Sequence, residues 1–79
     1  MWSVCHFEYV KDNMIGYAEV ETTNKEDFNV WLSLMYRICY NESAQIIDFY
    51  YPYEIDESDK EKIEKALIDE LKEGGVLEA

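Results

Sequence analysis

The most regular hydrophobic pattern in the chain falls in residues 28–39. An α-helix brings residues three and four apart onto one face, so apolar residues at those intervals favour an amphipathic helix. The residues with this spacing are Phe28, Trp31, Leu32, Met35, Ile38 and Cys39. Asn24 can cap such a helix, Asp27 completes a variant of the capping box, and Asn41 marks its end. The sequence therefore predicts a helix here, with Trp31 in the core.

A second helix is predicted near the C-terminus. Residues 58–61 (SDKE) have the form of a capping box, in which Ser58 and Glu61 satisfy backbone donors at a helix start. Three apolar residues then follow at intervals of four, as a buried helix face requires. These are Ile63, Leu67 and Leu71. The pair Gly74 and Gly75 is typical of a helix end.

Three further segments have the character of β-strands. Residues 2–10 are rich in β-forming side chains, and residues 15–22 alternate between apolar and polar. Asp12 and Asn13 between them suit a tight turn, because both residue types tolerate positive φ. Residues 44–53 form the third predicted strand. Pro52 indicates that it closes at that end or lies at a sheet edge.

The order of these elements is ββαβα, which predicts a single α+β domain over residues 1–79. We expect a three-stranded, mainly antiparallel sheet with both helices packed on one face, so that each apolar stripe is buried once. A chain of this length buries roughly 60% of the surface that its unfolded form exposes, so every apolar contact matters.

A turn centred on residues 12–13 also predicts the register of the first hairpin. Val10 should then pair with Ile15, Glu8 with Tyr17, His6 with Glu19 and Val4 with Glu21. The side chains expected to face the helices are Cys5, Phe7, Tyr9, Ala18, Val20, Ile47, Phe49 and Tyr51. Those expected on the outward face are Trp2, Val4, His6, Glu8, Ile15, Tyr17, Glu19, Glu21, Ile46, Asp48 and Tyr50. This predicted outward face has no lysine or arginine in its interior.

Aromatic side chains mixed with carboxylates suit the recognition of a basic protein surface. Tyrosine supplies rigid contact area, and carboxylates pair with Arg and Lys. Tyr53 and the acidic residues after it extend the predicted surface. The predicted partner-binding residues are Glu8, Tyr17, Glu19, Glu21, Asp48, Tyr50, Tyr53, Glu54, Asp56 and Glu57. The alternative is that the tyrosines only cover a thin sheet, while the acids favour solubility and complement a helix N-terminus.

The chain has 18 acidic residues against seven Lys and Arg, a net charge of −11. Direct binding to nucleic acid requires the opposite sign, because affinity comes from neutralising phosphates. An anionic membrane would repel the chain as well, and no segment is apolar enough to span a bilayer. The charge therefore favours a basic protein partner.

The sequence offers little catalytic chemistry. His6 is the only histidine, and Cys5 is expected on the opposite face of its strand, so no nucleophile is placed beside it. The carboxylates that could gather as a cation site are Glu8, Glu19, Glu21 and Asp48, but a flat sheet face rarely wraps six oxygen ligands. Nucleotide-binding glycine motifs, HExxH and CxxC are absent. We predict no enzyme activity, no cofactor and no metal.

The predicted function is that of a small acidic inhibitor that docks on a basic, nucleic-acid-handling protein such as a nuclease or a CRISPR effector. Imitation of nucleic-acid charge is one way for it to act. The composition resembles that of phage-encoded counter-defence proteins, the anti-CRISPR and anti-restriction inhibitors, without a motif of any one family. An immunity protein or antitoxin against a basic toxin, and a self-associating structural or regulatory module, are the alternatives. A monomer or weak homodimer is expected, in the cytoplasm because the start lacks a secretion signal, and in the host cytoplasm if phage-encoded.

Overall fold

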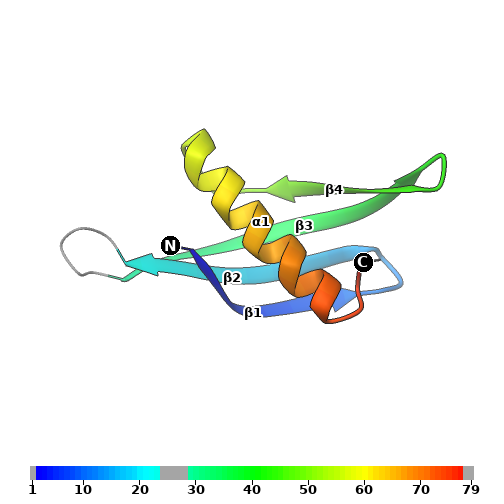
Figure 1. The fold of residues 1–79 in the computed structure, drawn as a ribbon, viewed down its shortest axis with the longest axis horizontal. Coiled ribbons are helices and arrows are strands. Elements are labelled where there is room, and N and C mark those ends of the chain that lie inside the picture. The colour runs from blue at the N-terminus through cyan, green and yellow to red at the C-terminus, as the bar shows by residue number, and fades with distance from the viewer. Residues whose placement is uncertain (1, 24–28, 78–79) are drawn as a thin grey trace.

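The computed structural model describes residues 2–23 and 29–77. Four strands form one antiparallel sheet in the order β1-β2-β3-β4, and a single helix crosses one of its faces (Figure 1). The elements are β1 (Ser3–Val10), β2 (Ile15–Thr23), β3 (Asn29–Asn41), β4 (Ala44–Tyr50) and α1 (Glu57–Glu73). The α+β class is as predicted, but the order ββαβα with three strands and two helices is wrong. The observed order is ββββα.

The error lies in residues 29–41, which form strand β3 and not a helix. Large apolar residues also occur at every second position of this segment, which is the pattern of a strand with one buried face, and the structure follows this pattern. Its even-numbered side chains Leu32, Leu34, Tyr36 and Ile38 are all buried. Trp31, predicted to be in the core, is 56% exposed on the other face. β3 pairs with both β2 and β4, and this ladder outweighs a helical spacing that was also present. The predicted cap at Asn24, with Asp27 and Phe28, lies outside the described residues.

A two-residue turn joins β3 to β4 where a helix end was predicted. Glu42 and Ser43 both have positive φ, 51° and 73°, which is the signature of a type I′ turn. This turn matches the twist of the two strands and sets their pairing, which begins at Asn41 and Ala44. β4 ends at Tyr50 and lies at the sheet edge, so the effect predicted for Pro52 is confirmed.

The first hairpin has the predicted register over most of its length. Val10 pairs with Ile15, Glu8 with Tyr17 and His6 with Glu19. A bulge between Val4 and His6 then shifts the pairing by one residue.

Because of this bulge, three predicted orientations at the start of β1 are wrong. Trp2 and Val4 pack against the core, whereas Cys5 is exposed. Val4 accordingly pairs with Val20 and not with Glu21.

Helix α1 buries the three residues predicted for its core line. Ile63, Leu67 and Leu71 are all 0% exposed. The helix starts at Glu57, after Asp56 at the N-cap position, and no side chain caps it. Ser58 therefore lies inside the first turn, and the predicted capping box does not form.

The helix ends as predicted, through a Schellman motif. Val76 N–H donates to the Leu71 carbonyl at 2.8 Å, and Gly75 N–H donates to the Lys72 carbonyl at 3.1 Å. Gly75 has a φ of 77°, a left-handed conformation that glycine adopts without strain. The turn directs the chain back to the sheet, where Leu77 joins the core.

The core lies between α1 and the sheet, and Tyr36 is its largest fully buried side chain. Its ring lies over Gly16 on the neighbouring strand, and a Cβ atom at Gly16 would be 2.0 Å from Tyr36 Cζ. Tyr36 also stacks on Tyr9, with ring centroids 6.4 Å apart, and its hydroxyl donates to the Glu8 carbonyl at 3.0 Å. Burial raises the pKa of Tyr36 to about 12, with a smaller contribution from Tyr9. The missing side chain of Gly16 thus makes room for this ring.

Two hydrogen bonds fix the start of α1 to the sheet. Trp2 Nε1 donates to Asp59 at 3.3 Å, and the Tyr51 hydroxyl donates to Glu64 at 2.7 Å. Burial and the Glu64 carboxylate raise the pKa of Tyr51, so the tyrosine remains a donor at neutral pH. No helix within residues 2–23 and 29–77 combines the length and the apolar character needed to span a bilayer.

Candidate functional site: the open face of the sheet

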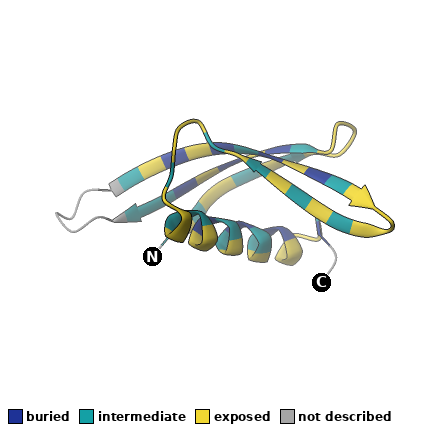
Figure 2. Ribbon diagram, turned by 90° about the horizontal axis from the view of Figure 1, so that it is seen from above, coloured by how far each residue is buried: buried dark blue, intermediate teal, exposed yellow. Residues whose placement is uncertain are grey.

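Helix α1 covers one face of the sheet, and no other element of the described chain covers the opposite face. Figure 2 shows the sheet arching over the helix on one side only. Strand side chains alternate between the two faces, so every strand contributes to both. We call the uncovered side the open face. Its side chains come from β1, β2, β3 and β4, and their positions follow from the register.

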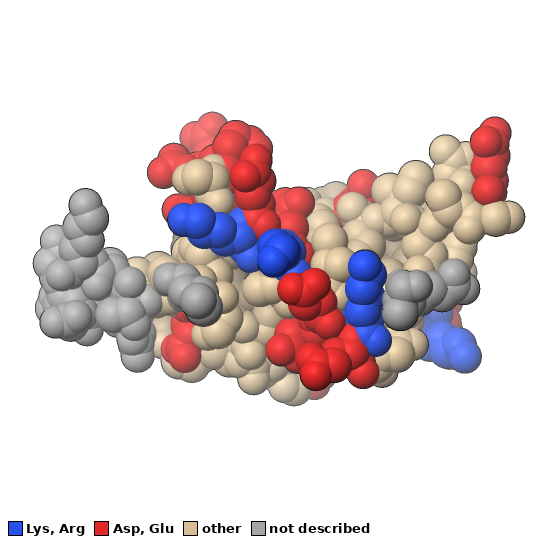
Figure 3. Space-filling model, viewed as in Figure 1, with Lys and Arg blue, Asp and Glu red and all other residues tan. Residues whose placement is uncertain are grey.

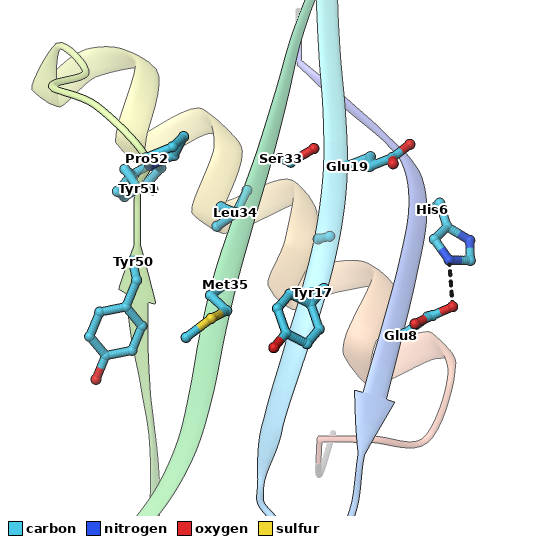
Figure 4. Close-up of a pocket in the computed structure, with 11 residues that line it drawn as sticks. His6, Glu8, Tyr17, Glu19, Ser33, Leu34, Met35, Tyr50, Tyr51 and Pro52 are labelled. Atoms are coloured by element: carbon cyan, nitrogen blue, oxygen red, sulfur yellow. Dashed lines mark hydrogen bonds and ion pairs between the residues drawn. The ribbon is translucent and has the colours of Figure 1, made fainter.

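The centre of the open face is one row of side chains that crosses all four strands. Glu8 pairs with Tyr17, Tyr17 with Met35, and Met35 with Tyr50. Figure 4 shows Tyr17, Met35 and Tyr50 side by side on neighbouring strands. Tyr17 is 53% exposed and Tyr50 is 47% exposed, so the row presents two tyrosine rings to solvent, with the half-buried Met35 between them. We call these four residues the central row.

A shallow groove of about 610 Å³ lies beside the central row. The next row on the open face is His6, Glu19 and Ser33. Ser33 is small, and β4 has already ended at this level, so the space above Ser33 is left empty between Tyr17 and Pro52 (Figure 4). The groove therefore has aromatic and apolar sides and a carboxylate at one end.

Carboxylates surround the central row without forming a tight cluster. Glu19 and Glu21 alternate along β2 on the open face, with Glu21 opposite Trp31. Asp48 on β4 lies opposite Arg37 on β3. Arg37 contradicts the expectation that this face has no arginine in its interior, since the segment that carries it was assigned to a helix. His6 is the register partner of Glu19, and its side chain contacts Glu8 on its own strand at 3.3 Å.

Cys5 stands at the bulge beside this face. The sequence-based argument against a nucleophile was that Cys5 points to the other side of β1, and that orientation is wrong. The thiol is nevertheless not activated. Partial desolvation, followed by the neighbouring Glu21 and Glu19 carboxylates, raises the pKa of Cys5 above its ordinary value. A raised pKa leaves less thiolate at neutral pH, which is the reverse of what nucleophilic catalysis needs.

The structure brings together six of the ten predicted binding residues. These six share the open face: Glu8, Tyr17, Glu19, Glu21, Asp48 and Tyr50. The other four lie on the connection to α1 and in its first turn, outside the groove. They are Tyr53, Glu54, Asp56 and Glu57, all exposed. Figure 3 shows an acidic group around the start of α1.

Sequence reasoning missed the contribution of β3 to the open face. Trp31, Ser33, Met35 and Arg37 are the residues concerned. The signal that could have revealed them is the alternation of residues 31–38, in which Ser33 and Arg37 are polar and the even-numbered residues are all large and apolar.

No family model, no curated protein and no solved structure matches this chain. Within residues 2–23 and 29–77, no three His, Cys, Asp or Glu side chains come close enough to hold a metal ion. The site is thus described by its own geometry: a flat aromatic and apolar row, a shallow groove beside it, and separated carboxylates around both. Such an arrangement offers contact area and negative charge to a binding partner.

Proposed function

We propose that this protein is a small acidic binding protein whose open face docks on a basic protein surface. The observation that carries the proposal is the central row, Glu8, Tyr17, Met35 and Tyr50. It crosses all four strands with both tyrosines exposed and Met35 half-buried between them, and Glu19, Glu21 and Asp48 lie around it. An antiparallel sheet with one solvated face normally shows polar residues on that face. Here the solvated face shows large aromatic side chains at its centre.

Each part of the open face has a physical use in recognition. Tyrosine contributes a large contact area at low cost in conformational entropy, and methionine adapts its shape to what it meets. The tyrosine rings can also hold a cation above their faces, and arginine does this most often. Carboxylates at the rim discriminate for basic partners and speed association. A partner surface rich in Arg or Lys would match all three kinds of side chain: the tyrosines, the methionine and the carboxylates.

The distribution of charge supports the same orientation. α1 has four lysines against seven acidic residues, a balance of −3 out of the net −11. Figure 3, viewed from the helix side, shows basic and acidic side chains interspersed along α1. Of the remaining −8, Glu78 after the helix contributes −1 and the chain before α1 contributes −7, so the attraction for a basic partner is centred away from the outer surface of the helix.

We infer that the partner is a nucleic-acid-handling protein, such as a nuclease or a CRISPR effector, and that binding inhibits it. Proteins of that kind carry extended basic surfaces because they must neutralise phosphates. A phage counter-defence inhibitor of the kind that this composition resembles would act in this way, and an immunity protein or antitoxin against a basic toxin would use the same physics. The place of action that goes with this proposal is the cytoplasm, or the host cytoplasm for a phage-encoded chain.

The first test is capture of the partner from a bacterial lysate, with and without nuclease treatment, followed by washing at low and high salt. The proposal predicts a basic nucleic-acid enzyme that is retained after nuclease treatment and released by salt, because salt screens exposed charges. Retention that disappears with nuclease would mean that nucleic acid bridges the two proteins, and the proposal would then be wrong.

A pair of matched variants separates a defined face from bulk charge. Glu19→Lys with Glu21→Lys reverses two charges on the open face, and Glu61→Lys with Asp69→Lys reverses two on exposed positions of α1. Both variants change the net charge equally. We expect the first pair to abolish capture with little change in melting temperature, and the second pair to weaken it only slightly. Equal loss in both would mean that net charge alone carries the binding.

Self-association of the open face is the alternative that the exposed Trp31, Tyr17 and Ile46 favour. A two-fold contact would bring like-charged carboxylates together, so salt should strengthen it. Size-exclusion chromatography at low and high salt distinguishes the cases. We expect a monomer, or a weak homodimer at most. A dimer that is stable at low salt and captures nothing from the lysate would replace the inhibitor proposal with a self-associating module.

A further inference from the structure

The two edges of the sheet are protected to different degrees. β1 has a bulge in its first half, and the end of α1 lies against its covered face, where the Phe7 ring approaches within 3.2 Å of the position of a Cβ on Gly74. β4 has no bulge in its pairing with β3 and no proline within its seven residues. Bulges, prolines and inward-pointing charges are the usual devices that prevent an edge strand from pairing with another chain. β4 has none of these three devices.

The backbone groups at the β4 edge can be identified from the turn. Residues that flank a two-residue turn exchange hydrogen bonds with each other, and the direction then alternates along the strand. The Asn41–Ala44 pair is the first hydrogen-bonded pair, and every second residue of β4 after it also bonds to β3. The residues that direct their N–H and C=O groups to β3 are therefore Ile46, Asp48 and Tyr50. Ile47 and Phe49 direct theirs away from it, where the described sheet has no further strand.

A second groove, of about 630 Å³, runs beside this edge between β4 and α1. Ile47 and Phe49 belong to its lining from the strand, and Ile68 and Lys72 from the helix. It exists because α1 crosses the sheet diagonally, close to β4 at its start and close to β1 at its end (Figure 1). The inner side of β4 towards its turn is therefore left partly uncovered. The groove could receive alternate side chains of a strand paired with β4.

The chain segment that contains β4 carries charge of one sign only. Between Arg37 and Lys60 the chain contains six acidic residues and no lysine or arginine, and β4 lies within this stretch. Figure 3 shows a mainly uncharged surface along β4, with a small acidic spot on it, between the charged outer side of α1 and an acidic group at the tip of the β3–β4 hairpin. Lys72 and Glu64 line the groove and offset each other. A second copy of this chain, at −11, is a poor occupant for such a site.

We propose that β4 and the groove beside it form a docking site for an extended basic segment of a partner protein. The segment pairs with the β4 backbone at Ile47 and Phe49. Its alternate apolar side chains enter the groove beside Ile68, and its basic side chains lie towards the acidic surroundings. This is strand addition at a sheet edge, in which the backbone supplies affinity and the alternate pockets supply specificity. The site is separate from the open face.

The test is a titration of the full ¹⁵N-labelled chain with a capped peptide of alternating lysine and valine, about seven residues long to match β4. We expect saturable changes at the Ile47 and Phe49 amides, with slower solvent exchange, and no change at Tyr17 or Glu19. Changes confined to the open face, or no changes, would overturn the proposal. Changes at the same amides on dilution without peptide would identify a second copy as the occupant and would also overturn it.

Two modified peptides test the backbone pairing itself. One carries N-methyl groups on all valines and the other on all lysines, so each has one blocked edge. Pairing with β4 requires that one of these peptides bind as before and the other at least roughly tenfold more weakly, since a net hydrogen bond contributes about 1 kcal/mol. Equal binding of both would exclude strand pairing.

The chain with Glu19→Lys and Glu21→Lys is the control for independence from the open face. It should bind the peptide with nearly unchanged affinity, because both substitutions lie on β2 and away from the β4 edge. Failure of the open-face proposal and failure of the edge proposal can therefore be observed separately.

Discussion

The two faces of the sheet differ in this protein: one is buried under α1 and the other is exposed. On the covered face, Val20, Leu34 and Tyr36 are at most 3% exposed, and Leu67 of α1 packs among them. On the open face, the neighbouring Tyr17 and Trp31 are more than half exposed. Both faces are rich in large apolar side chains, so hydrophobicity alone does not distinguish them. The difference is that α1 covers only one of the two faces. The open face therefore contributes little to stability, and its residues are available for binding.

The largest expected effect is on the covered face. Leu67→Ala removes a fully buried side chain from the centre of α1, and we expect the free energy of unfolding to fall by about 2–5 kcal/mol. Urea denaturation followed by circular dichroism measures this change. In a chain of this size such a loss is a large fraction of the total stability. A loss below about 1 kcal/mol would mean that α1 is not the element that closes the core.

Gly16→Ala tests the close approach beneath Tyr36. The new methyl group would meet the Tyr36 ring, so either the ring or the strand must move, and we expect a loss of about 1–3 kcal/mol. A double-mutant cycle with Tyr36→Leu identifies the cause, because the smaller side chain makes room for the methyl group. Additive losses would show that Gly16 matters for another reason.

The raised pKa of Tyr36 predicts how the stability of the covered face depends on pH. Its pKa is raised on folding, so the folded state holds the hydroxyl proton more tightly than the unfolded state does. This contribution to stability is fully present below pH 10 and is lost as the pH rises from 10 towards about 12. We expect Tyr36→Phe to be less stable than the wild type at neutral pH, where it lacks the bond to the Glu8 carbonyl.

The difference between the two proteins should shrink above pH 10, as measured by urea titrations across this range. A difference that stays constant with pH would contradict the burial of the hydroxyl.

The smallest expected effect is on the open face. Trp31→Ala removes one of the largest side chains in the protein, yet we expect the free energy of unfolding to change by less than about 0.5 kcal/mol, because Trp31 is mainly exposed. The sequence alone predicted the opposite, with Trp31 in the core of a helix. A loss of about 3 kcal/mol would restore that interpretation and would break the distinction between the faces.

The parts of the fold that could be predicted are those determined by local signals. The core line of α1 has an unambiguous period and a double-glycine end, and the first hairpin has a turn of polar residues that fixes its register near the turn. For this reason Glu8, Tyr17 and Glu19 were assigned to the correct face. The six acids and tyrosines that reached the open face all lie on strands that were identified as strands.

The parts that could not be predicted depend on contacts across the sheet. Residues 28–39 satisfy a helical and an alternating pattern at once, and the choice is made by pairing with β2 and β4, which no local feature reveals. The bulge at Cys5 likewise leaves no mark in the sequence, but it exchanges the faces of Val4 and Cys5. Consequently Trp31, Met35 and Arg37 were absent from the predicted site.

The measurement that tests the central claim most directly is an NMR spectrum of the chain with ¹³C-labelled methionine methyl groups, recorded with and without the captured partner. Met35 lies at the centre of the open face, whereas Met14 is 42% exposed in the β1–β2 turn and serves as an internal control. Met35→Leu and Met14→Leu assign the signals. We predict that the partner shifts or broadens the Met35 signal and leaves the Met14 signal unchanged. A bound partner that leaves Met35 unaffected would contradict the assignment of the open face as the binding surface.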